Sequence, residues 1–587
     1  MANIRFDNWS TPERTARQQL DDICRKTGAY VATPDYDTNK FSIWGTAEQA
    51  DSAEKEVSAW YSHIRATGIR PSGPKWHKEK AFDGRNASRI DQREREAEMA
   101  LALRNMENDT DFEFVLHHLW PDEPKMPEFI QKYDKPVLEQ IRLNVLCRIE
   151  FDQGTIPAYR VSAGTETTVK EVSARMNNLI MEMIAQKGDF VRCSRFKLPR
   201  ANMYRSRVGW DKDPTTGLYL PTIHGEGLPA DEVDDWTKLC TSEDAKNRSI
   251  IRQSITTCIA SLYAPSKHVR MRVTFAELGF AQLQRPPPER DYHTFDEFCQ
   301  MIPHQNVRIS PLGLRSSKGN LSELVDVLDT MPEFGPGETF YTLHFDFDSR
   351  NQSTLRLEVE FRIGIMTKEL EIFATRWLEF AHNANEYEML EVNMLDLEHL
   401  KCNYQIHIGG TNIFEPDDLK GVGKQMLSFQ DKVSYSAPPK GIKAEPRRRA
   451  VYPPGNRDLR RVEEIITVRY QFKDTDGVFE LQRKDIFDET SHNKSVTPIS
   501  SVGAGKYYYP EWDSLMGEFA NLQPGEAVSW TRALSSFFLD KKAGDHGGNY
   551  RALPKGFKTW LKEIEEIQGL LTEGIESVEG FGVNDGR

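Results

Sequence analysis

Apolar residues in the first 190 positions follow two similar patterns, and each pattern predicts a small α/β unit. In the first unit, the spacing predicts a helix over 11–26, strands over 30–33 and 41–44, and a second helix. In the second unit, it predicts a helix over 137–144, strands over 145–151 and 158–161, and a long helix that begins after Gly164-Thr165. Turn-forming residues at 34–39 and 152–154 separate the strands.

The second helix of each unit carries the same apolar stripe. An offset of 119 residues places Gly45 on Gly164 and carries six apolar positions onto six others. An internal repeat is one explanation. Chance is the other, because amphipathic helices align easily and the preceding strands match only with a bulge or a one-residue shift. The six pairs are Ala50 and Val169, Ala53 and Val172, Val57 and Met176, Trp60 and Leu179, Tyr61 and Ile180, and Ile64 and Met183.

From about residue 339 the pattern becomes predominantly that of strands. Apolar and charged residues alternate from Leu355 to Arg362, and the segment from His268 to Phe275 shows the same alternation, so each is expected to bury one face. Asp476-Gly477 lies between two apolar runs and predicts a hairpin. A terminal helix over 557–571 is expected to fray from Gly574 onward. The predicted fold class is α+β and multidomain, with the two α/β units followed by a larger mixed region with antiparallel sheet.

Composition shifts and proline-rich stretches divide the chain into seven predicted segments. Residues 71–130 are expected to form a charged helical linker between the two α/β units, and residues 436–461 a basic, proline-rich loop. The full set is 1–70 for the first unit, 71–130, 131–188 for the second unit, 189–335 for a basic and aromatic segment with a mixed α/β region, 336–435 for a β-rich region, 436–461, and 462–587 for a C-terminal hairpin and helical region.

Composition narrows the class of protein. The 587 residues have a formal net charge of −13 and 28% charged residues, which is typical of a soluble protein and argues against a polybasic nucleic-acid coat. No apolar run reaches the roughly 20 residues of a membrane span, and the N-terminus does not resemble a signal peptide. The seven cysteines are widely spaced, which favours a reducing compartment, cytoplasmic or nuclear.

The first α/β unit resembles a KH domain, a small RNA-binding fold. The resemblance rests on Leu20-x-x-Ile23-x-x-x-Thr27-Gly28-Ala29-x-Val31-x-x-Pro34, on Phe41-Ser42-Ile43-Trp44-Gly45, and on the helix through Ala53 and Val57. The second unit resembles only the later half of a KH domain, over 145–184. The resemblance implies two KH-like modules, single-stranded RNA or proteins of an RNA–protein complex as partners, and no cofactor.

Both units depart from the KH pattern at the loop that grips nucleic acid. KH domains hold the backbone in a G-x-x-G loop, yet no glycine occurs between Met1 and Leu20. The G-x-x-G of this chain, Gly544 to Gly547, is far from both units and contains an aspartate. The units are therefore degenerate KH-like modules. The pattern Arg270-Met271-Arg272-Val273-x-Phe275 before Phe295-x-Glu297-Phe298 also resembles a fungal protein family and implies no reaction.

A basic, aromatic segment from Asp189 to Trp210 is the best candidate for RNA contact. It holds six basic residues and one acid, with aromatic residues between them, so its cations would position phosphates while its rings stack on bases. The alternative is that the segment docks on acidic residues of the same chain. The candidate RNA-binding residues are Arg192, Arg195, Lys197, Arg200, Tyr204, Arg205, Arg207 and Trp210.

Other candidate sites are weaker. A second basic segment, Lys440 to Arg461, is interpreted as a solvated loop, with a localisation signal or a phosphate patch as alternatives. His344, Asp346 and Asp348 share one face of a predicted strand, an arrangement that suits Mg²⁺ but also an ordinary half-exposed strand. Neither a complete catalytic motif nor a metal site is predicted.

The sequence therefore predicts a non-catalytic RNA-binding protein, or a scaffold of an RNA–protein assembly. The alternative is a protein-interaction scaffold whose KH-like units have lost RNA binding. A metal-dependent nuclease or transferase is a remote third hypothesis. Oligomeric state is not predicted.

Overall fold

The computed structural model describes residues 2–5, 13–32 and 40–66, and residues 112–580 with gaps. The gaps in the last range are 134–136, 155, 187–190, 201–206, 226, 263–267, 305, 315–320, 349–352, 365–368, 382–386, 415, 417–420, 439, 457, 474, 491–494, 518–521, 529–530 and 539–553. The chain divides into two compact units, 1–99 and 100–587. None of the described helices is long and apolar enough to cross a membrane.

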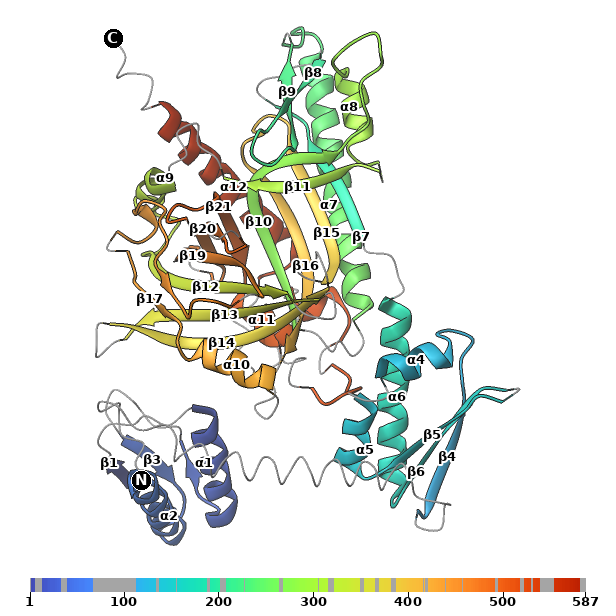
Figure 1. Cartoon of the computed structure of the whole chain (residues 1–587), viewed down its shortest axis with the longest axis vertical. Helices are drawn as coiled ribbons and strands as arrows, with labels where there is room; N and C mark the ends of the chain where they lie inside the picture. Colours follow the sequence, from blue (N-terminus) through green and yellow to red (C-terminus); the bar gives the residue numbers. More distant parts are fainter. Residues whose placement is uncertain are drawn as a thin grey trace. The chain divides into compact units, whose positions relative to one another are not determined.

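The N-terminal unit is a three-stranded antiparallel sheet with two helices (Figure 1). Its elements are β1 (Ala2–Arg5), α1 (Glu13–Thr27), β2 (Tyr30–Val31), β3 (Lys40–Trp44) and α2 (Ala47–Ala66), and its strand order is β1-β3-β2. Leu20 and Ile23 on α1 and Ala53 and Val57 on α2 recur at helical spacing, and they bury one face of each helix against Ile43. The two predicted helices and the strand predicted over 41–44 are confirmed. β1 was not predicted, because a strand of four residues gives too short a pattern to recognise.

The second α/β unit has the same strand order. Its elements are β4 (Phe114–Leu119), α4 (Met126–Tyr133), α5 (Glu139–Val145), β5 (Arg148–Asp152), β6 (Ala158–Ala163) and α6 (Glu166–Gln186), and the sheet order is β4-β6-β5. α2 begins at Ala47 and α6 at Glu166, which is again an offset of 119 residues. The shared topology and offset favour an internal repeat over chance.

The boundary predicted for this second unit is wrong. β4 pairs with β6 along its whole length, from Phe114 opposite Ala163 to Leu119 opposite Ala158. The predicted linker 71–130 therefore contains a strand and the start of a helix that belong to the second unit. β4 is a strand because it pairs with β6, and local sequence does not reveal such a long-range pairing. The charged stretch 75–98 lies outside the described residues.

Eight antiparallel strands form a closed ring (Figure 1). They are β10 (His268–Gln282), β12 (Glu338–Asp348), β13 (Ser353–Ile363), β14 (Leu370–Ala381), β16 (Asn403–Phe414), β19 (Leu459–Gln471), β20 (Val478–Asp488) and β21 (Ser500–Tyr508). Around the ring the order is β16-β14-β13-β12-β19-β20-β21-β10, and β10 pairs with β16 to close it. The two shortest strand pairings in the ring join residues 377–379 to 412–414 and residues 273–275 to 505–507. The hairpin predicted at Asp476-Gly477 joins β19 and β20.

The same sheet extends beyond the ring. β15 (Tyr387–Asp396) pairs with β16, and β7 (Val191–Lys197) pairs in parallel with β15, while β8 (Arg207–Lys212), β9 (Tyr219–His224) and β11 (Arg308–Gly313) continue from β10. One sheet thus joins strands from the predicted segments 189–335, 336–435 and 462–587, which are not separate domains. The predicted loop 436–461 lies between β17 (Ser434–Tyr435) and the ring, and it contains a short helical turn, Gly441–Lys443, and β18 (Ala450–Val451).

The apolar core lies outside the ring. Alternate residues of the ring strands, such as Leu343, Phe345, Leu357 and Val359, point outward and are buried. Helices contribute to this core from all sides: α7 (Val233–Ala260), α9 (Leu321–Leu328), α10 (Gly421–Gln430), α11 (Pro510–Gly517) and α12 (Phe557–Gly580). A second core beside it joins α8 (Phe295–Met301) to β8, β9 and β11.

The terminal helix is longer than predicted. α12 continues from Phe557 to Gly580, so the expected fraying from Gly574 is wrong. Ile575 and Val578 are buried, and their packing stabilises turns that helix propensity alone does not favour.

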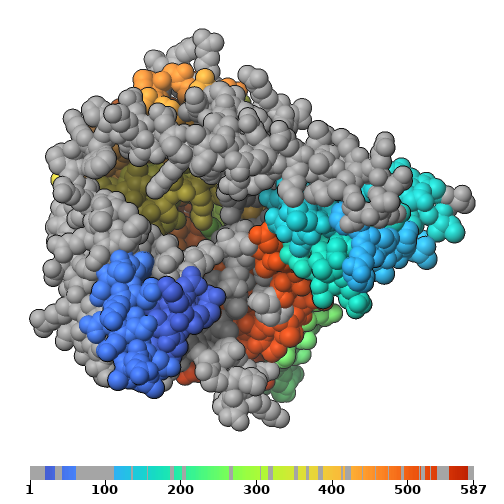
Figure 2. All heavy atoms as spheres, turned by 90° about the horizontal axis from the view of Figure 1, so that it is seen from below, coloured from blue at the N-terminus to red at the C-terminus, as the bar shows by residue number. Residues whose placement is uncertain are grey.

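Residues 522–526 contact the second α/β unit (Figure 2). Asn178 donates a hydrogen bond to the Gly525 carbonyl at 2.9 Å, and Arg175 forms an ion pair with Glu526 at 3.1 Å. Gly525 has a φ of +76°, and a Cβ there would lie 2.6 Å from the Arg175 carbonyl oxygen, so glycine is required for this close approach.

Candidate functional site in the barrel lumen

The ring strands turn their charged residues inward. Around the lumen, a cavity of about 460 Å³ is lined by eight basic side chains and four carboxylates. The basic residues are Arg270, Arg272, Arg356, Arg362, Arg376, Arg469, Lys484 and Lys506, and the acids are Glu358, Glu360, Glu480 and Asp513. Strict alternation produces this arrangement, because every second residue of a barrel strand faces the interior.

At one place in the lumen, Arg272 is held by three contacts with two residues. Its guanidinium forms two hydrogen bonds with the Asp513 carboxylate, at 2.7 and 2.5 Å, and lies 3.7 Å from the centre of the Tyr508 ring. Asp513 reaches the lumen because α11 is anchored by Trp512 and Met516, both fully buried in the outer core. These contacts fix one end of the cavity in position.

Two buried glutamates flank His344. Its Nδ1 lies 3.1 Å from Glu463 Oε2, and its Nε2 lies 3.5 Å from Glu358 Oε1. Burial alone would raise the pKa of Glu358, but the charges of His344, Arg376 and Arg270 outweigh burial and lower that pKa to about 2. The pKa of Glu463 also lies well below its usual range, since His344, Lys484 and Arg356 outweigh its burial. Both carboxylates are therefore charged at neutral pH.

Among the lumen cations, Arg270 has the least compensation of its charge and its hydrogen-bond donors by neighbouring groups. Its Nε is buried without a hydrogen-bond partner in the described part of the chain. Burial lowers the pKa of its guanidinium, and the like charges of Arg376 and Arg272 lower it further, against the opposing effect of Glu358 and Asp513. A buried donor without a partner costs folding free energy, so the lumen is electrostatically incomplete at this residue.

The metal site considered for β12 is not assembled. Asp346 accepts two hydrogen bonds from Arg356, at 2.6 and 3.0 Å, and pairs with Arg461 at 3.2 Å. Asp348 pairs with Arg460 instead. Arginine neutralises both carboxylates, and among the described residues no three His, Cys, Asp or Glu side chains are placed to hold a metal ion.

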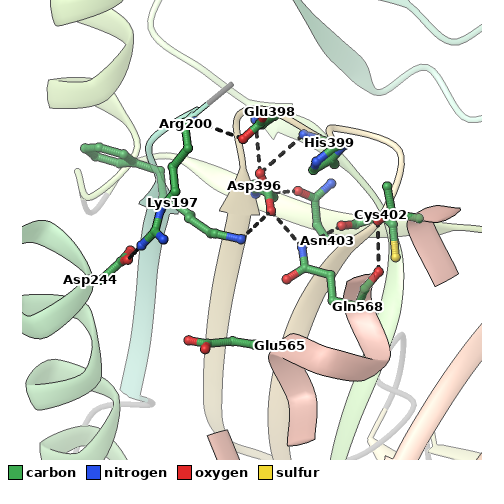
Figure 3. Close-up of polar contacts among 12 residues, drawn as sticks. Lys197, Arg200, Asp244, Asp396, Glu398, His399, Cys402, Asn403, Glu565 and Gln568 are labelled. Atoms are coloured by element: carbon green, nitrogen blue, oxygen red, sulfur yellow. Dashed lines mark hydrogen bonds and ion pairs between the residues drawn. The ribbon is translucent and has the colours of Figure 1, made fainter. Parts of the chain in front are cut away.

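Three residues of the basic segment pair with acids of the same chain. Figure 3 shows the contacts of two of them, Lys197 and Arg200. Arg192 donates to Glu391 at 3.0 Å, and Lys197 to Asp396 at 3.1 Å. Arg200 pairs with Asp244 through its side chain, and its backbone N–H donates to Glu398 at 2.8 Å. The contacts of Arg192 and Lys197 follow from β7 being a strand of the main sheet, where β15 supplies acids at matching positions, whereas Asp244 belongs to α7.

The remaining candidate RNA-binding residues lie in different environments. Trp210 is partly buried in the second core, where its Nε1 donates to His293 Nδ1 at 2.9 Å and its ring packs edge-on against Phe280. Arg207 is exposed, and its guanidinium carbon lies 6.0 Å from the Tyr292 ring centre. The Nε of Arg195 is buried without a hydrogen-bond partner in the described residues. Tyr204 and Arg205 lie outside the described residues.

The second basic segment crosses the outside of the barrel instead of extending into solvent. Ile442, Ala444 and Ala450 are buried, and the backbone N–H groups of Arg449 and Ala450 donate to Glu464 at 2.7 and 2.8 Å. The interpretation of this segment as a freely solvated loop is therefore wrong: local composition predicted exposure, but its apolar residues pack on the barrel.

The sequence predicts the strands that build the lumen but not the environment of their charged residues. The alternation of Arg270 and Arg272 with apolar neighbours, and of Arg356, Glu358, Glu360 and Arg362 with theirs, was interpreted as one buried and one exposed face. In the structure the charged face lines the cavity of the lumen, and of these residues Arg362 is exposed. Charge of both signs on the polar face of several long strands was the available signal, but closure of the ring depends on pairings that no local pattern contains.

Two solved structures of the S. pombe Pct1 RNA triphosphatase are similar over 56% of this chain. In one, the enzyme is in complex with the Spt5 CTD; it has 9% identity and a TM-score of 0.25, with 93% of that chain covered. The other is the enzyme by itself, with 10% identity and a TM-score of 0.26, and 92% of that chain is covered. No curated protein matches the chain.

The model of one protein family matches residues 234–544, which include all eight ring strands and more than half of the chain. The family is described as a domain of unknown function, DUF7905. The chain belongs to this DUF7905 family.

Proposed function

We propose that this protein binds a small ligand that carries several phosphate groups, and that it holds those phosphates in the barrel lumen. The observation that carries the proposal is the excess of eight basic side chains over four carboxylates around one cavity. Arginine recognises phosphate through paired N–H donors, and its attraction to an anion is strengthened where the surrounding strands limit access of water.

Arg270 is the residue expected to gain most from a bound phosphate. Its unpartnered Nε would acquire an acceptor, and a negative charge would relieve its repulsion from Arg272 and Arg376. Most other lumen cations already have an acidic partner in the chain, for example Arg469, which donates to Glu480 at 2.7 Å. These pairs would hold the walls in place while Arg270 contacts the ligand.

The size of the cavity supports a small ligand. A volume of about 460 Å³ falls within the range of pockets that enclose small molecules, and it suits a polyphosphate chain or a nucleotide. A folded macromolecule does not fit inside a ring of eight strands. The proposed role is binding, and no chemical step is assigned to it.

RNA binding through the basic segment, and the scaffold role without RNA, remain separate proposals. Arg207 supports RNA contact because it is exposed beside Tyr292. The ion pairs of Arg192, Lys197 and Arg200 support the alternative, in which the segment docks on acids of its own chain.

Calorimetric titration of the full chain with inorganic tripolyphosphate at low ionic strength tests the lumen proposal. We expect binding that weakens as salt is added, and a loss of about tenfold or more in affinity on Arg270→Gln, a loss that corresponds to one charge-assisted hydrogen bond. Arg252→Gln, on the exposed face of α7, is the matched control and should leave binding unchanged. ATP and a single-stranded RNA oligonucleotide, titrated in parallel, identify the type of phosphate ligand.

Two results would contradict the lumen proposal: no binding of tripolyphosphate by the native chain, or equal affinity in the native and Arg270→Gln proteins. Circular dichroism of each variant separates lost binding from lost folding. If Arg270→Gln does not fold, Lys484→Gln removes another of the cations that line the cavity and provides a second test.

A further inference from the structure

The sheet of the second α/β unit has two edge strands of different composition (Figure 1). Its order is β4-β6-β5, so within the described chain β4 and β5 each have one side without a neighbouring strand. On β5, Arg148 and Glu150 lie on the same face and form an ion pair, and charged residues of this kind discourage pairing with another chain. β4 contains no Asp, Glu, Lys or Arg, and its Val115, Leu116 and Leu119 are 39%, 37% and 76% exposed.

An edge of the main sheet shows another way of protecting such a strand. β7 is the last strand beyond β15, and α7 packs along it. Asn247 on α7 donates a hydrogen bond to the Phe196 carbonyl of β7 at 2.8 Å, so a side chain of this helix satisfies a backbone group of the edge strand. β5 is thus protected by charge and β7 by a helix, whereas β4 has neither protection among the described residues.

The free edge of β4 presents backbone groups at every second residue. Trp120, directly after β4, donates its N–H to the Pro157 carbonyl at 2.8 Å and continues the register of β4 with β6. In an antiparallel pair, residues that exchange hydrogen bonds alternate with residues that do not. The even-numbered residues of β4 therefore bond to β6, and the N–H and C=O groups of Val115, His117 and Leu119 point away from it. In the described part of the chain, no other group bonds to them.

A second copy of β4 fits this edge in one antiparallel register. The outward backbone groups belong to odd-numbered residues, and the register centred on His117 uses all three of them. It places His117 opposite His117 of the second copy, and Val115 opposite Leu119 in both directions. A shift of two residues loses one of these pairs. Two exposed apolar side chains thus meet each other by symmetry, as an isologous interface requires.

Charge also favours a second copy as the occupant. With a net charge of −13, two copies of the chain repel each other over much of their surface. β4 avoids this repulsion, because it carries no carboxylate or ammonium group. Arg160, the cross-strand neighbour of His117 on β6, already donates to Glu150 at 2.8 Å, so the adjoining strands add no unpaired charge at this point.

We propose that β4 pairs in antiparallel fashion with β4 of a second copy of this chain. The two three-stranded sheets become one continuous six-stranded sheet across a twofold axis at His117. Main-chain hydrogen bonds hold the strands together, and contacts of Val115 with Leu119 of the second copy set the register. This interface is separate from the barrel lumen and does not depend on a phosphate ligand.

Sedimentation equilibrium of the full chain tests this proposal. We expect a species of twice the 67.4 kDa of one chain, with a population that rises with concentration. Val115→Lys with Leu119→Lys sets lysine opposite lysine at two pairs, so the dimer should dissociate about tenfold more readily or more. Val115→Lys with Leu119→Glu sets opposite charges at the same two pairs and should restore the dimer. Ile156→Lys, at an exposed position in the turn between β5 and β6, is the control and should change nothing.

Hydrogen exchange of the native chain, followed by mass spectrometry, provides the same test if the variants do not fold. Amides of β4 should exchange more slowly as protein concentration rises, whereas those of β5 should not change. A native chain that is monomeric at every concentration would overturn the proposal, and so would equal dimerisation of the Lys/Lys and Lys/Glu variants. Slow exchange of β4 at all concentrations would show that the strand is covered within one chain, which also overturns it. Arg270→Gln should leave the dimer intact, so this proposal and the lumen proposal fail separately.

Discussion

Glu463 and Glu464 are neighbours on β19, yet they occupy opposite faces of the barrel wall. Glu463 faces the lumen, where the surrounding cations hold its pKa well below the usual range. Glu464 faces outward, where burial raises its pKa to about 7, with Asp485 adding to the effect and the N–H groups of Arg449 and Ala450 opposing it. Both side chains are almost completely buried. The difference therefore comes from their neighbours and not from exposure to water.

This contrast identifies the face on which binding chemistry is concentrated. On the outer face, carboxylates such as Glu464 are few, and they hold backbone segments against an apolar core. On the inner face, charges of both signs surround an open cavity with cations in excess. An enclosed polar surface of this kind costs folding free energy, which is consistent with a surface retained for a ligand.

The largest expected effect is on stability, from Glu463→Gln. The substitution leaves Lys484, Arg461 and His344 without their shared carboxylate, so we expect a loss of about 3–5 kcal/mol in the free energy of unfolding at neutral pH. The adjacent Glu464→Gln retains a neutral carbonyl acceptor for the two backbone N–H groups, as the protonated carboxyl group does, and should not lower the stability. Urea unfolding of the two variants, followed by circular dichroism, measures both effects.

The same pair of variants also tests the charge balance of the lumen. Glu463→Gln increases the excess of positive charge, so it should bind tripolyphosphate more tightly than the native chain despite its lower stability. Equal losses of stability in the two variants would show that the inner and outer faces do not differ as described.

A slightly smaller effect is expected from pH, and it arises on the outer face. The pKa of Glu464 is about 7 in the folded chain and 4.5 in the unfolded one, so the folded state holds this proton more tightly. Its contribution to stability is fully present below pH 4.5 and is lost as pH rises through about 7, a change on the order of 3 kcal/mol. Because glutamine resembles the protonated carboxyl group, the unfolding free energies of the native chain and Glu464→Gln should be similar at low pH and separate as pH rises, with the native chain becoming the less stable of the two. If the native and variant curves are parallel, Glu464 does not titrate in this range.

Local patterns were sufficient for individual elements. The apolar stripes on α2 and α6, the turn at Asp476-Gly477 and the alternation in β13 each depend on residues within a few positions of one another, and each element is observed. The ring is different. Its closure requires Val273 to pair with Tyr507 and with Ile406, and such distant registers have no local signature.

The candidate site was missed for the same reason. Charge along the chain pointed to the segment from Asp189 to Trp210, which holds six basic residues and one acidic residue. Folding brings acids to that segment from far away, as with Arg192 and Glu391, which are 199 residues apart. In the lumen, by contrast, strands of mixed charge combine into a surface with an excess of cations. Net charge at a site is a property of the fold, and sequence windows estimate it poorly.

The smallest effects are expected within the basic segment itself, where a paired cation, Lys197, lies on β7 and an exposed cation, Arg207, lies on β8. Lys197→Met removes a donor from the buried carboxylate of Asp396, so we expect a loss of about 2 kcal/mol, limited because Gln568 and the N–H of Glu398 still donate to it. Arg207 is exposed, and Arg207→Met should cost less than about 0.5 kcal/mol.

RNA binding by the two variants gives the opposite order if the segment contacts RNA through its exposed cations. Arg207→Met should then weaken binding without loss of stability, whereas Lys197→Met should lower stability and leave the affinity of the folded protein unchanged, because its ammonium group is already paired with Asp396. Anisotropy titrations at two salt concentrations, with urea unfolding of the same samples, separate the two effects. Equal affinity in the native chain and Arg207→Met would instead favour a segment whose cations serve only to hold β7 against β15.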